Sequence, residues 1–376
     1  MTNVLVIADD LTGAAEIAGI ATRHGLPTRL VREKPATPLP LGLTVLDTDT
    51  RLLPPHEATR AVRGFIDDLR ADEFDLVFKK TDSALRGPIL AEVEAIMDSL
   101  GHRSAILVPQ NPSRGRTIVG GQYHIDGIPL DQTSFAQDPH HPARTANVLE
   151  LLGPSPTRTV RCLEPHEVAP PDGIVIAAAR TIDDVRRSAC LFAAESSTGV
   201  LPAGGGDFFQ SILESRGLRA ARPFITQLTG KRRLFVCGSA SRDSLKLIAR
   251  ADRADIPICA MPDDLDTWHD QVLTSLETAN AAVVFVGRPL DRSPGASQRI
   301  ESALAQVVAR VLDRQPIEQL FLEGGATASS VSRRMGWQTL EICGELSPGV
   351  VQMRATDGQT ITVKPGSYPW PETVWV

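Results

Sequence analysis

The chain has 376 residues, more than one hydrophobic core usually organises, so two domains are expected. Apolar residues make up 42% and charged residues 22%, as in an ordinary globular protein, and the net charge of -6 argues against nucleic acid as a partner. The five cysteines show no paired spacing, and we find neither a signal pattern nor a membrane-spanning stretch. We therefore expect a cytoplasmic protein without a membrane partner.

Short apolar runs alternate with longer segments of helical period in the first half, which is typical of βαβ units and a mostly parallel sheet. In chain order, strands are predicted at residues 4–8, 43–46, 76–78, 105–108 and 174–178, with helices at 14–22, 56–70, 89–100 and 182–194. The Gly- and Pro-containing segment 109–130 interrupts this rhythm. It predicts an insertion that is either a ligand-facing flap or a plain surface hairpin.

A polar stretch at residues 215–233 separates the two halves, so we predict domains over residues 1–215 and 232–376. In the second half, strands are predicted at 234–237, 256–260, 282–286, 319–322 and 338–342, and helices at 245–250, 271–278, 298–312 and 328–335. The predicted fold class is α/β, with two α/β domains that have mostly parallel sheets and helices on their faces.

Polar residues follow the first strand, at an edge where ligands bind in open parallel sheets. Asp9 and Asp10 come directly after residues 4–8, just before a helix. Thr12 alone is an adequate cap for that helix, so two further acids exceed what capping needs. This excess favours a functional role for them, in binding hydroxyl groups or Mg²⁺.

The next strands of the first half are followed by similar clusters. These clusters include Arg51, then Lys80, Asp82, Ser83 and Arg86. An anionic, hydroxyl-rich ligand suits this set, because Arg clamps a carboxylate bidentately while Asp and Ser bond hydroxyls. The alternative is a surface salt-bridge network around a helix start. After residues 105–108, Arg116 beside Gly115 either presents a guanidinium to an anion or belongs to a basic turn.

Two strand-to-helix junctions of the second half are rich in glycine. Residues 238–241 read GSAS and residues 323–327 read EGGAT. Glycine at such a junction lets the backbone approach phosphate oxygens, and Ser or Thr adds a hydroxyl at the helix start. Neither segment is a Walker A or a dinucleotide-binding motif, and a plain tight turn is the alternative. Because the histidines and cysteines show no ligand spacing, the sequence leaves any metal ligands unknown.

Together these segments resemble the four-carbon acid sugar kinase family, whose members phosphorylate threonate, erythronate or 3-oxo-tetronate with ATP. The resemblance rests on collinear motifs across nearly the whole chain: ADDLTGA at 8–14, KKTDSALRG at 79–87, GRT at 115–117 with GIPL at 127–130, GSAS at 238–241, GGAT at 324–327, PGV at 348–350 and KPG at 364–366. Ala84 stands where the family more often has Thr, and Ala326 stands where it more often has Glu or Asp.

The resemblance implies an N-terminal substrate domain, a C-terminal ATP domain and an active site in the cleft between them. Arg86 is expected to be catalytic, and either Asp10 or Asp82 is expected to be the base; we favour Asp10. The implied substrate-binding residues are Asp9, Asp10, Arg51, Lys80, Asp82, Ser83, Arg86 and Arg116, and the implied ATP-binding residues are Ser239, Gly324, Gly325, Ala326, Thr327 and Gly349. ATP and Mg²⁺ are the expected cofactors, the terminal hydroxyl of a short sugar acid is the expected acceptor, and a homodimer is compatible with the sequence.

Two other classes of protein remain open at this point. One is an NAD-dependent oxidoreductase acting on a hydroxy acid, against which the missing dinucleotide motif counts. The other is a non-catalytic sensor of sugar acids or nucleotides with the same fold, which the alanine at position 326 leaves open.

Overall fold

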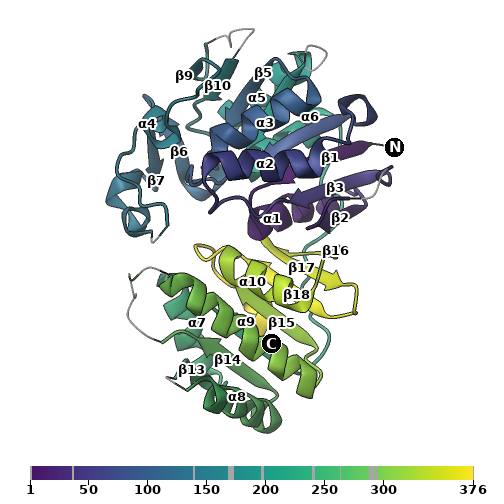
Figure 1. Cartoon of the computed structure of the whole chain (residues 1–376), viewed down its shortest axis with the longest axis vertical. Helices are drawn as coiled ribbons and strands as arrows, with labels where there is room; N and C mark the ends of the chain where they lie inside the picture. Colours follow the sequence, from purple (N-terminus) through teal and green to yellow (C-terminus); the bar gives the residue numbers. More distant parts are fainter. Residues whose placement is uncertain are drawn as a thin grey trace. The chain divides into compact units, whose positions relative to one another are not determined.

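The computed structural model describes residues 2–35, 38–138, 140–167, 173–195, 199–238, 242–262, 264–287, 293 and 295–375. It consists of two compact units (Figure 1). The first unit comprises residues 1–9 and 24–221, and the second comprises residues 10–23 and 222–376. Both are α/β, as predicted. Among the described residues, no helix is both long and apolar enough to span a membrane.

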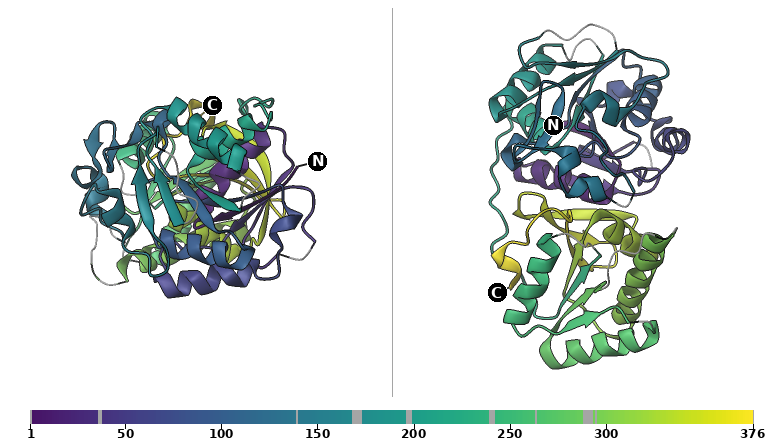
Figure 2. Two further views of the ribbon diagram at one scale, coloured as in Figure 1. Left: turned by 90° about the horizontal axis from the view of Figure 1, so that it is seen from above. Right: turned by 90° about the vertical axis from the view of Figure 1, so that its left-hand side faces the viewer.

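The first unit is built on a parallel sheet whose strand order is β2-β3-β1-β4-β11-β5-β10-β9. Its strands are β1 (Asn3–Ala8), β2 (Thr28–Val31), β3 (Gly42–Asp47), β4 (Leu76–Lys80), β5 (Ser104–Val108), β9 (Val160–Leu163), β10 (Gly173–Ala177) and β11 (Val200–Gly204). The central strands are continuous apolar runs because helices cover both faces of the sheet. In Figure 2, left, α2 (Pro55–Ile66) and α3 (Ile89–Leu100) lie on one face, opposite α5 (Ile182–Glu195) and α6 (Gly206–Ser215).

The predicted insertion is a small antiparallel hairpin sheet in the first unit. Its strands are β6 (Arg116–Val119), β7 (Gln122–Ile125) and β8 (Ile128–Pro129). Two short 3₁₀ turns, Leu130–Gln132 and Ser134–Gln137, and the short helix α4 (Val148–Leu152) follow it. Ile118, Tyr123, Leu130 and Val148 are fully buried in the core cluster of the unit, so the insertion is anchored rather than loosely attached.

The second unit has the strand order β13-β14-β12-β15-β18-β17-β16. The strands are β12 (Arg233–Cys237), β13 (Ile258–Ala260), β14 (Ala281–Phe285), β15 (Gln319–Glu323), β16 (Thr339–Ser347), β17 (Val350–Ala355) and β18 (Thr360–Lys364). The first four and β18 pair in parallel, whereas β16–β17 and β17–β18 pair antiparallel. Its later helices are α7 (Arg242–Arg253), α8 (Leu265–Ala279), α9 (Ala296–Arg314) and α10 (Gly325–Met335).

The first helix is grouped with the second unit, although the predicted first domain includes it. Helix α1 (Leu11–Arg23) follows β1 of the first unit but packs in the second, where it contacts α10, β16, β17 and β18. The domain bounds 1–215 and 232–376 stay a prediction. The alternation of strand and helix patterns in the sequence shows that an apolar helix follows the strand. It does not show which sheet buries that helix.

Candidate active site

The carboxyl ends of β1, β3 and β4 meet at one edge of the first sheet. The strand register pairs Ala8 with Asp47 and with Lys80, so the residues that follow each strand are neighbours. The backbone N–H groups of Thr50 and Arg51 donate to the carbonyl oxygen of Asp9, at 3.0 and 3.1 Å. This pairing fixes the loop after β3 beside the end of β1.

A chain of ion pairs runs along this edge. Arg51 donates through Nε and Nη2 to the two oxygens of Asp9, at 2.7 and 3.0 Å, and its Nη1 lies 3.5 Å from Oδ1 of Asp82. Asp82 in turn accepts two bonds from Arg86, from Nε at 3.0 Å and Nη2 at 2.9 Å. The structure therefore brings together four of the predicted substrate-binding residues in one network of alternating charge.

The electrostatics of this network keep its carboxylates ionised. Burial alone would raise the pKa of Asp82, but the guanidinium groups of Arg86 and Arg51 outweigh it and hold that pKa well below its usual range. The pKa of Asp9 is also lowered, because Arg51 and Lys79 outweigh the effect of burial. The two carboxylates thus hold the arginines in fixed positions.

The loop between β4 and α3 carries the remaining predicted groups of this edge. Lys80 is buried, and its Nζ donates to the carbonyl oxygen of Thr81 at 2.8 Å. Leu85 has a φ of 59°, in the left-handed region that non-glycine residues seldom adopt. Backbone strain of this kind is often retained at ligand sites, where the surrounding contacts enforce it.

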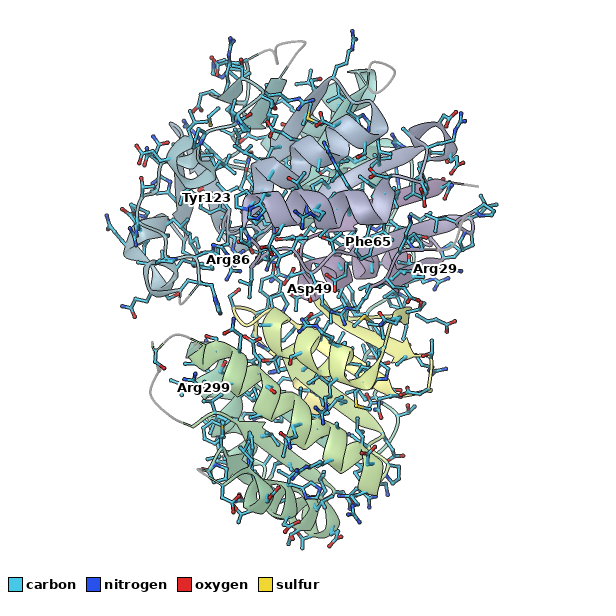
Figure 3. The ribbon with its side chains drawn as sticks, in the orientation of Figure 1. Arg29, Asp49, Phe65, Arg86, Tyr123 and Arg299 are labelled. Carbon is cyan, nitrogen blue, oxygen red and sulfur yellow. The ribbon has the colours of Figure 1, made fainter. Side chains whose placement is uncertain are left out.

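The inserted hairpin lies against this loop. Arg116, at the start of β6, donates to Oγ of Ser83, and the hydroxyl of Tyr123 in β7 donates to the carbonyl oxygen of Ser83. Figure 3 labels Arg86 and Tyr123 on the same side of the first unit. Burial raises the pKa of Tyr123, so its hydroxyl stays protonated and remains a donor. These contacts connect the hairpin to the predicted substrate-binding loop.

Sequence reasoning missed several residues that complete the network. Asp138 Oδ2 accepts from Nη1 of Arg86 at 2.9 Å, and Nε2 of His141 lies 3.0 Å from the carbonyl oxygen of Arg51. Beneath the edge, the buried Glu92 of α3 lies 2.7 Å from Nζ of Lys79 and accepts from Thr50 at 2.5 Å. In the sequence, Glu92 looks like a residue of an ordinary helix. A carboxylate on such a largely apolar helix does, however, indicate a buried acid with a partner.

Asp10 lies in the second unit, at the start of α1. Its Oδ1 accepts from the backbone N–H of Gly13 at 2.8 Å, and its Oδ2 accepts from the Thr12 hydroxyl at 2.6 Å. A Cβ atom on Gly325 would overlap Oδ2 of Asp10, so only glycine fits at this point of α10 without displacing the carboxylate. The prediction grouped Asp10 with the first domain, and its carboxylate packs against Gly325 at the glycine turn.

The carboxyl ends of β12, β15 and β18 form the corresponding edge of the second sheet. Register pairs Glu323 with Cys237 on one side and with Lys364 on the other. Glu323 is fully buried and accepts from Nζ of Lys364 at 2.9 Å and from Nε1 of Trp370 at 2.8 Å. The N–H of Gly324 donates to the carbonyl oxygen of Lys364 at 3.0 Å. A buried ion pair therefore fixes the place where the glycine turn begins.

The predicted nucleotide-binding residues are located as follows. Gly324 has a φ of 92° and precedes α10, whose first residues are Gly325, Ala326 and Thr327. Gly238, after β12, approaches Thr327 so closely that a Cβ would overlap the Thr327 hydroxyl. Gly349 forms the turn between β16 and β17, at the same sheet edge as Lys364. Ser239 lies outside the described residues.

The described part of the chain holds no cluster of three or more His, Cys, Asp or Glu residues suited to a metal ion. Oxygen ligands for a hard cation near the glycine turn would come from Asp10 and from the Thr12 hydroxyl beside it. That donor set fits an ion that keeps most of its ligands from water and phosphate, as Mg²⁺ does in nucleotide sites.

The two edges define a class of protein: one suits a small anionic ligand, and the other suits phosphate groups at a helix N-terminus. Comparison with known families agrees. A model described as "Sugar-binding N-terminal domain" matches residues 4–202, and one described as "Nucleotide-binding C-terminal domain" matches residues 234–368. The chain belongs to the four-carbon acid sugar kinase family.

Curated relatives that match along the whole chain are kinases. The chain is similar to a D-erythronate kinase from Heliobacterium modesticaldum, at 27% identity over 93% of this chain and 89% of the relative. It is also similar to a D-threonate kinase from Salmonella typhimurium, at 25% identity over 92% and 89% of the two chains. A 3-oxo-tetronate kinase from Methylobacterium radiotolerans is 24% identical over 96% and 95%. These relatives favour a phosphotransferase over the oxidoreductase alternative.

Solved structures share the fold. A protein from Salmonella typhimurium LT2 aligns with a TM-score of 0.76 at 18% identity, over 100% of this chain and 98% of the other. A protein from Haemophilus influenzae aligns with a TM-score of 0.69 at 20% identity, over 99% and 98%. At these identities the likeness shows the fold alone.

Proposed function

We propose that this protein is an ATP-dependent kinase that phosphorylates the terminal hydroxyl of a four-carbon sugar acid of the erythronate, threonate or 3-oxo-tetronate type. The observation that carries the proposal is the position of Asp10. Its carboxylate lies beside Gly325, which falls within the match to the nucleotide-binding model, whereas Asp10 itself and Asp9 before it fall within the match to the sugar-binding model.

In this proposal the first edge recognises the acid. Arg86 and Arg51 supply planar guanidinium groups for its carboxylate, and Lys80 supplies a further positive charge. Asp9, Asp82, Ser83 and Arg116 bond its hydroxyls or hold the groups that do so. The pairing of both arginines with carboxylates supports this role, because donors held in advance lose little conformational entropy when the ligand binds.

The second edge binds ATP in this proposal. The backbone N–H groups of Gly324, Gly325, Ala326 and Thr327 open α10, where a helix N-terminus favours negative charge. Ser239 and Gly349 complete the proposed contacts. When Mg²⁺ is bound with the nucleotide, it neutralises charge on the phosphate oxygens, and Asp10 and Thr12 are the side chains that would hold it or its water ligands.

Asp10 is the proposed general base. Phosphoryl transfer depends on positioning and charge neutralisation, and a carboxylate that accepts the proton of the acceptor hydroxyl completes the set. The N–H of Gly13 and the Thr12 hydroxyl orient the Asp10 carboxylate. A fixed orientation is what a base needs in order to meet the attacking hydroxyl in line with the γ-phosphate.

The test is to incubate the protein with Mg-ATP and D-erythronate, D-threonate, 3-oxo-tetronates or the matching four-carbon polyols, and then to locate phosphate by ³¹P and ¹³C NMR. We expect phosphate on the terminal hydroxyl of at least one acid and very little turnover of the polyols, which cannot pair with Arg86. Equal turnover of polyols, or phosphate at the carboxyl end, would contradict the proposal. Absence of ADP release with every acid would favour the sensor alternative. A homodimer and a cytoplasmic location stay predictions.

A further inference from the structure

Arg86 is held by two carboxylates that come from different parts of the first unit. Asp82, four residues before it, accepts from Nε and Nη2, and Asp138 accepts from Nη1 at 2.9 Å. The Asp138 side chain is 15% exposed and that of Arg86 is 29% exposed. One cation in a partly buried position therefore faces two anions.

Asp82 is sufficient to orient the guanidinium of Arg86. Its two bonds to Arg86 are bidentate, and it also accepts from the backbone N–H groups of Ala84 and Arg86, at 3.0 and 3.2 Å. A bidentate pair already fixes the plane and the direction of the fork. The second carboxylate adds little to that orientation.

Asp138 is held in place independently of Arg86. Its Oδ1 accepts from the backbone N–H groups of His140 and His141, at 3.0 and 2.8 Å. Burial would raise its pKa, but Arg86 and these N–H groups lower it, so Asp138 is ionised at neutral pH. A fixed negative charge therefore occupies one of the donor positions of Arg86.

A cavity of about 320 Å³ is lined by Arg86 but not by Asp138. Its lining includes Arg86, Phe135, His140 and His141. A carboxylate ligand in this cavity would lie near Arg86, whose charge both Asp82 and Asp138 already face. Because Arg86 has a single positive charge, its attraction for such a ligand is reduced by each carboxylate that already faces it.

We propose that Asp138 is an internal competitor of the substrate carboxylate at Arg86, and that it thereby sets the affinity of the site for sugar acids. Asp138 acts through Arg86 and is a positioning residue rather than a catalytic one. The inference rests on the proposed function in one respect only: the ligand of Arg86 is taken to be a carboxylate.

The experiment titrates the wild-type protein and the Asp138→Asn variant with D-erythronate and with D-threonate, and isothermal titration calorimetry measures the Kd of each acid. Asparagine keeps an oxygen for the N–H groups of His140 and His141 but removes the charge. We expect the Kd of the acid to fall about threefold or more, with the Kd of ATP unchanged. The matched control is Asp98→Asn, which removes an exposed carboxylate that likewise accepts from arginines, Arg63 and Arg158, in the same unit. It should leave both Kd values unchanged.

A merely structural role for Asp138 predicts the opposite sign, since loss of an Arg86 contact would weaken acid binding. An unchanged or raised Kd in a folded Asp138→Asn protein would therefore overturn the inference. In an Arg86→Lys background the gain in acid affinity from Asp138→Asn should shrink below about twofold, because the guanidinium that pairs with Asp138 is missing. A gain of full size in that background would also overturn it.

These binding measurements are independent of catalysis. If neither acid is phosphorylated, the proposed function fails, yet tighter acid binding by Asp138→Asn would still support the competition at Arg86. If the acids are phosphorylated and acid binding does not tighten, the kinase proposal stands and the role of Asp138 falls.

Discussion

The two strand edges of this protein differ in the chemical groups that they present: side chains at one and backbone groups at the other. In the first unit, side chains provide the chemistry: Asp9, Arg51, Asp82 and Arg86 form a network of paired charges. In the second unit, the backbone provides it, through a glycine turn at the start of α10, and the buried pair of Glu323 and Lys364 supports that turn from beneath.

In the proposed function, the difference follows from what each edge recognises. A small polyhydroxy acid differs from its analogues in single functional groups, so a site for it needs several oriented side chains. Phosphate groups are the same in every nucleotide, and a row of N–H groups at a helix N-terminus suits them without side-chain chemistry. Substitutions should therefore act through charge and geometry at the first edge, and through steric access to the backbone at the second.

The largest effect is expected for Asp10→Asn, at the base proposed for the reaction. We expect kcat to fall about a hundredfold or more, because the amide cannot accept the proton of the acceptor hydroxyl. The Kd of ATP measured without Mg²⁺ and the Kd of the acid should change little, and steady-state kinetics with calorimetry would measure kcat and these Kd values. Asp266→Asn, at an exposed position of α8, is the control. A kcat within about threefold of wild type for Asp10→Asn would remove Asp10 from the catalytic role.

At the second edge, Gly325→Ala should weaken ATP binding about tenfold or more, because the added Cβ overlaps the Asp10 carboxylate at the start of α10. The Kd of the acid, measured in the absence of nucleotide, should be unaffected. Gly64→Ala is the matched control, since Gly64 lies within α2 with open space around it and alanine there favours the helix. Equal ATP affinity in folded Gly325→Ala protein would contradict the role of the glycine turn.

At the first edge, Arg86→Lys should lower kcat/KM for the acid about tenfold, because lysine keeps the charge and loses the bidentate fork held by Asp82. The KM for ATP should not change. Arg63→Lys, at an exposed salt bridge to Asp98, provides the comparison. Wild-type kinetics for Arg86→Lys would show that Arg86 does not bind the acid and only forms salt bridges near the surface.

The smallest effect concerns stability in the second unit rather than catalysis. Burial raises the pKa of Glu345 to about 7, although the N–H of Gly349 and Arg23 act in the other direction. The pKa of Glu345 is higher in the folded state than in the unfolded state. Its contribution to the free energy of unfolding is therefore fully present below about pH 4.5 and is lost as the pH rises through about 7. We expect Glu345→Gln to flatten the fall in Tm between pH 5 and about pH 8. An identical pH dependence of Tm in both proteins would contradict this assignment.

Much of the fold could be predicted from periodicity. The α/β class, the five strands predicted in the second half and the inserted hairpin after β5 are confirmed, because apolar runs and turn residues are local signals. Strands β17 and β18 were not predicted. The unit that buries α1 could not be predicted, since its neighbours β16 and β17 lie more than three hundred residues away in the chain.

The site was predictable to a similar degree. Strand ends marked Asp9, Arg51, Asp82 and Arg86, which the structure brings together. Asp138 and Glu92 were missed because they reach the edge from a loop and from a helix face, through tertiary contacts alone. The roles proposed for all these residues stay predictions until they are tested by substitution.

The most direct test of the account is a crossed binding experiment that measures the Kd of D-erythronate and of ATP, each by calorimetry, for the wild type, Arg86→Lys and Gly325→Ala. We predict that Arg86→Lys weakens only the acid and that Gly325→Ala weakens only ATP, each about tenfold. Loss of both ligands in either folded variant, or the reverse pattern, would contradict the assignment of the acid to the first edge and the nucleotide to the second.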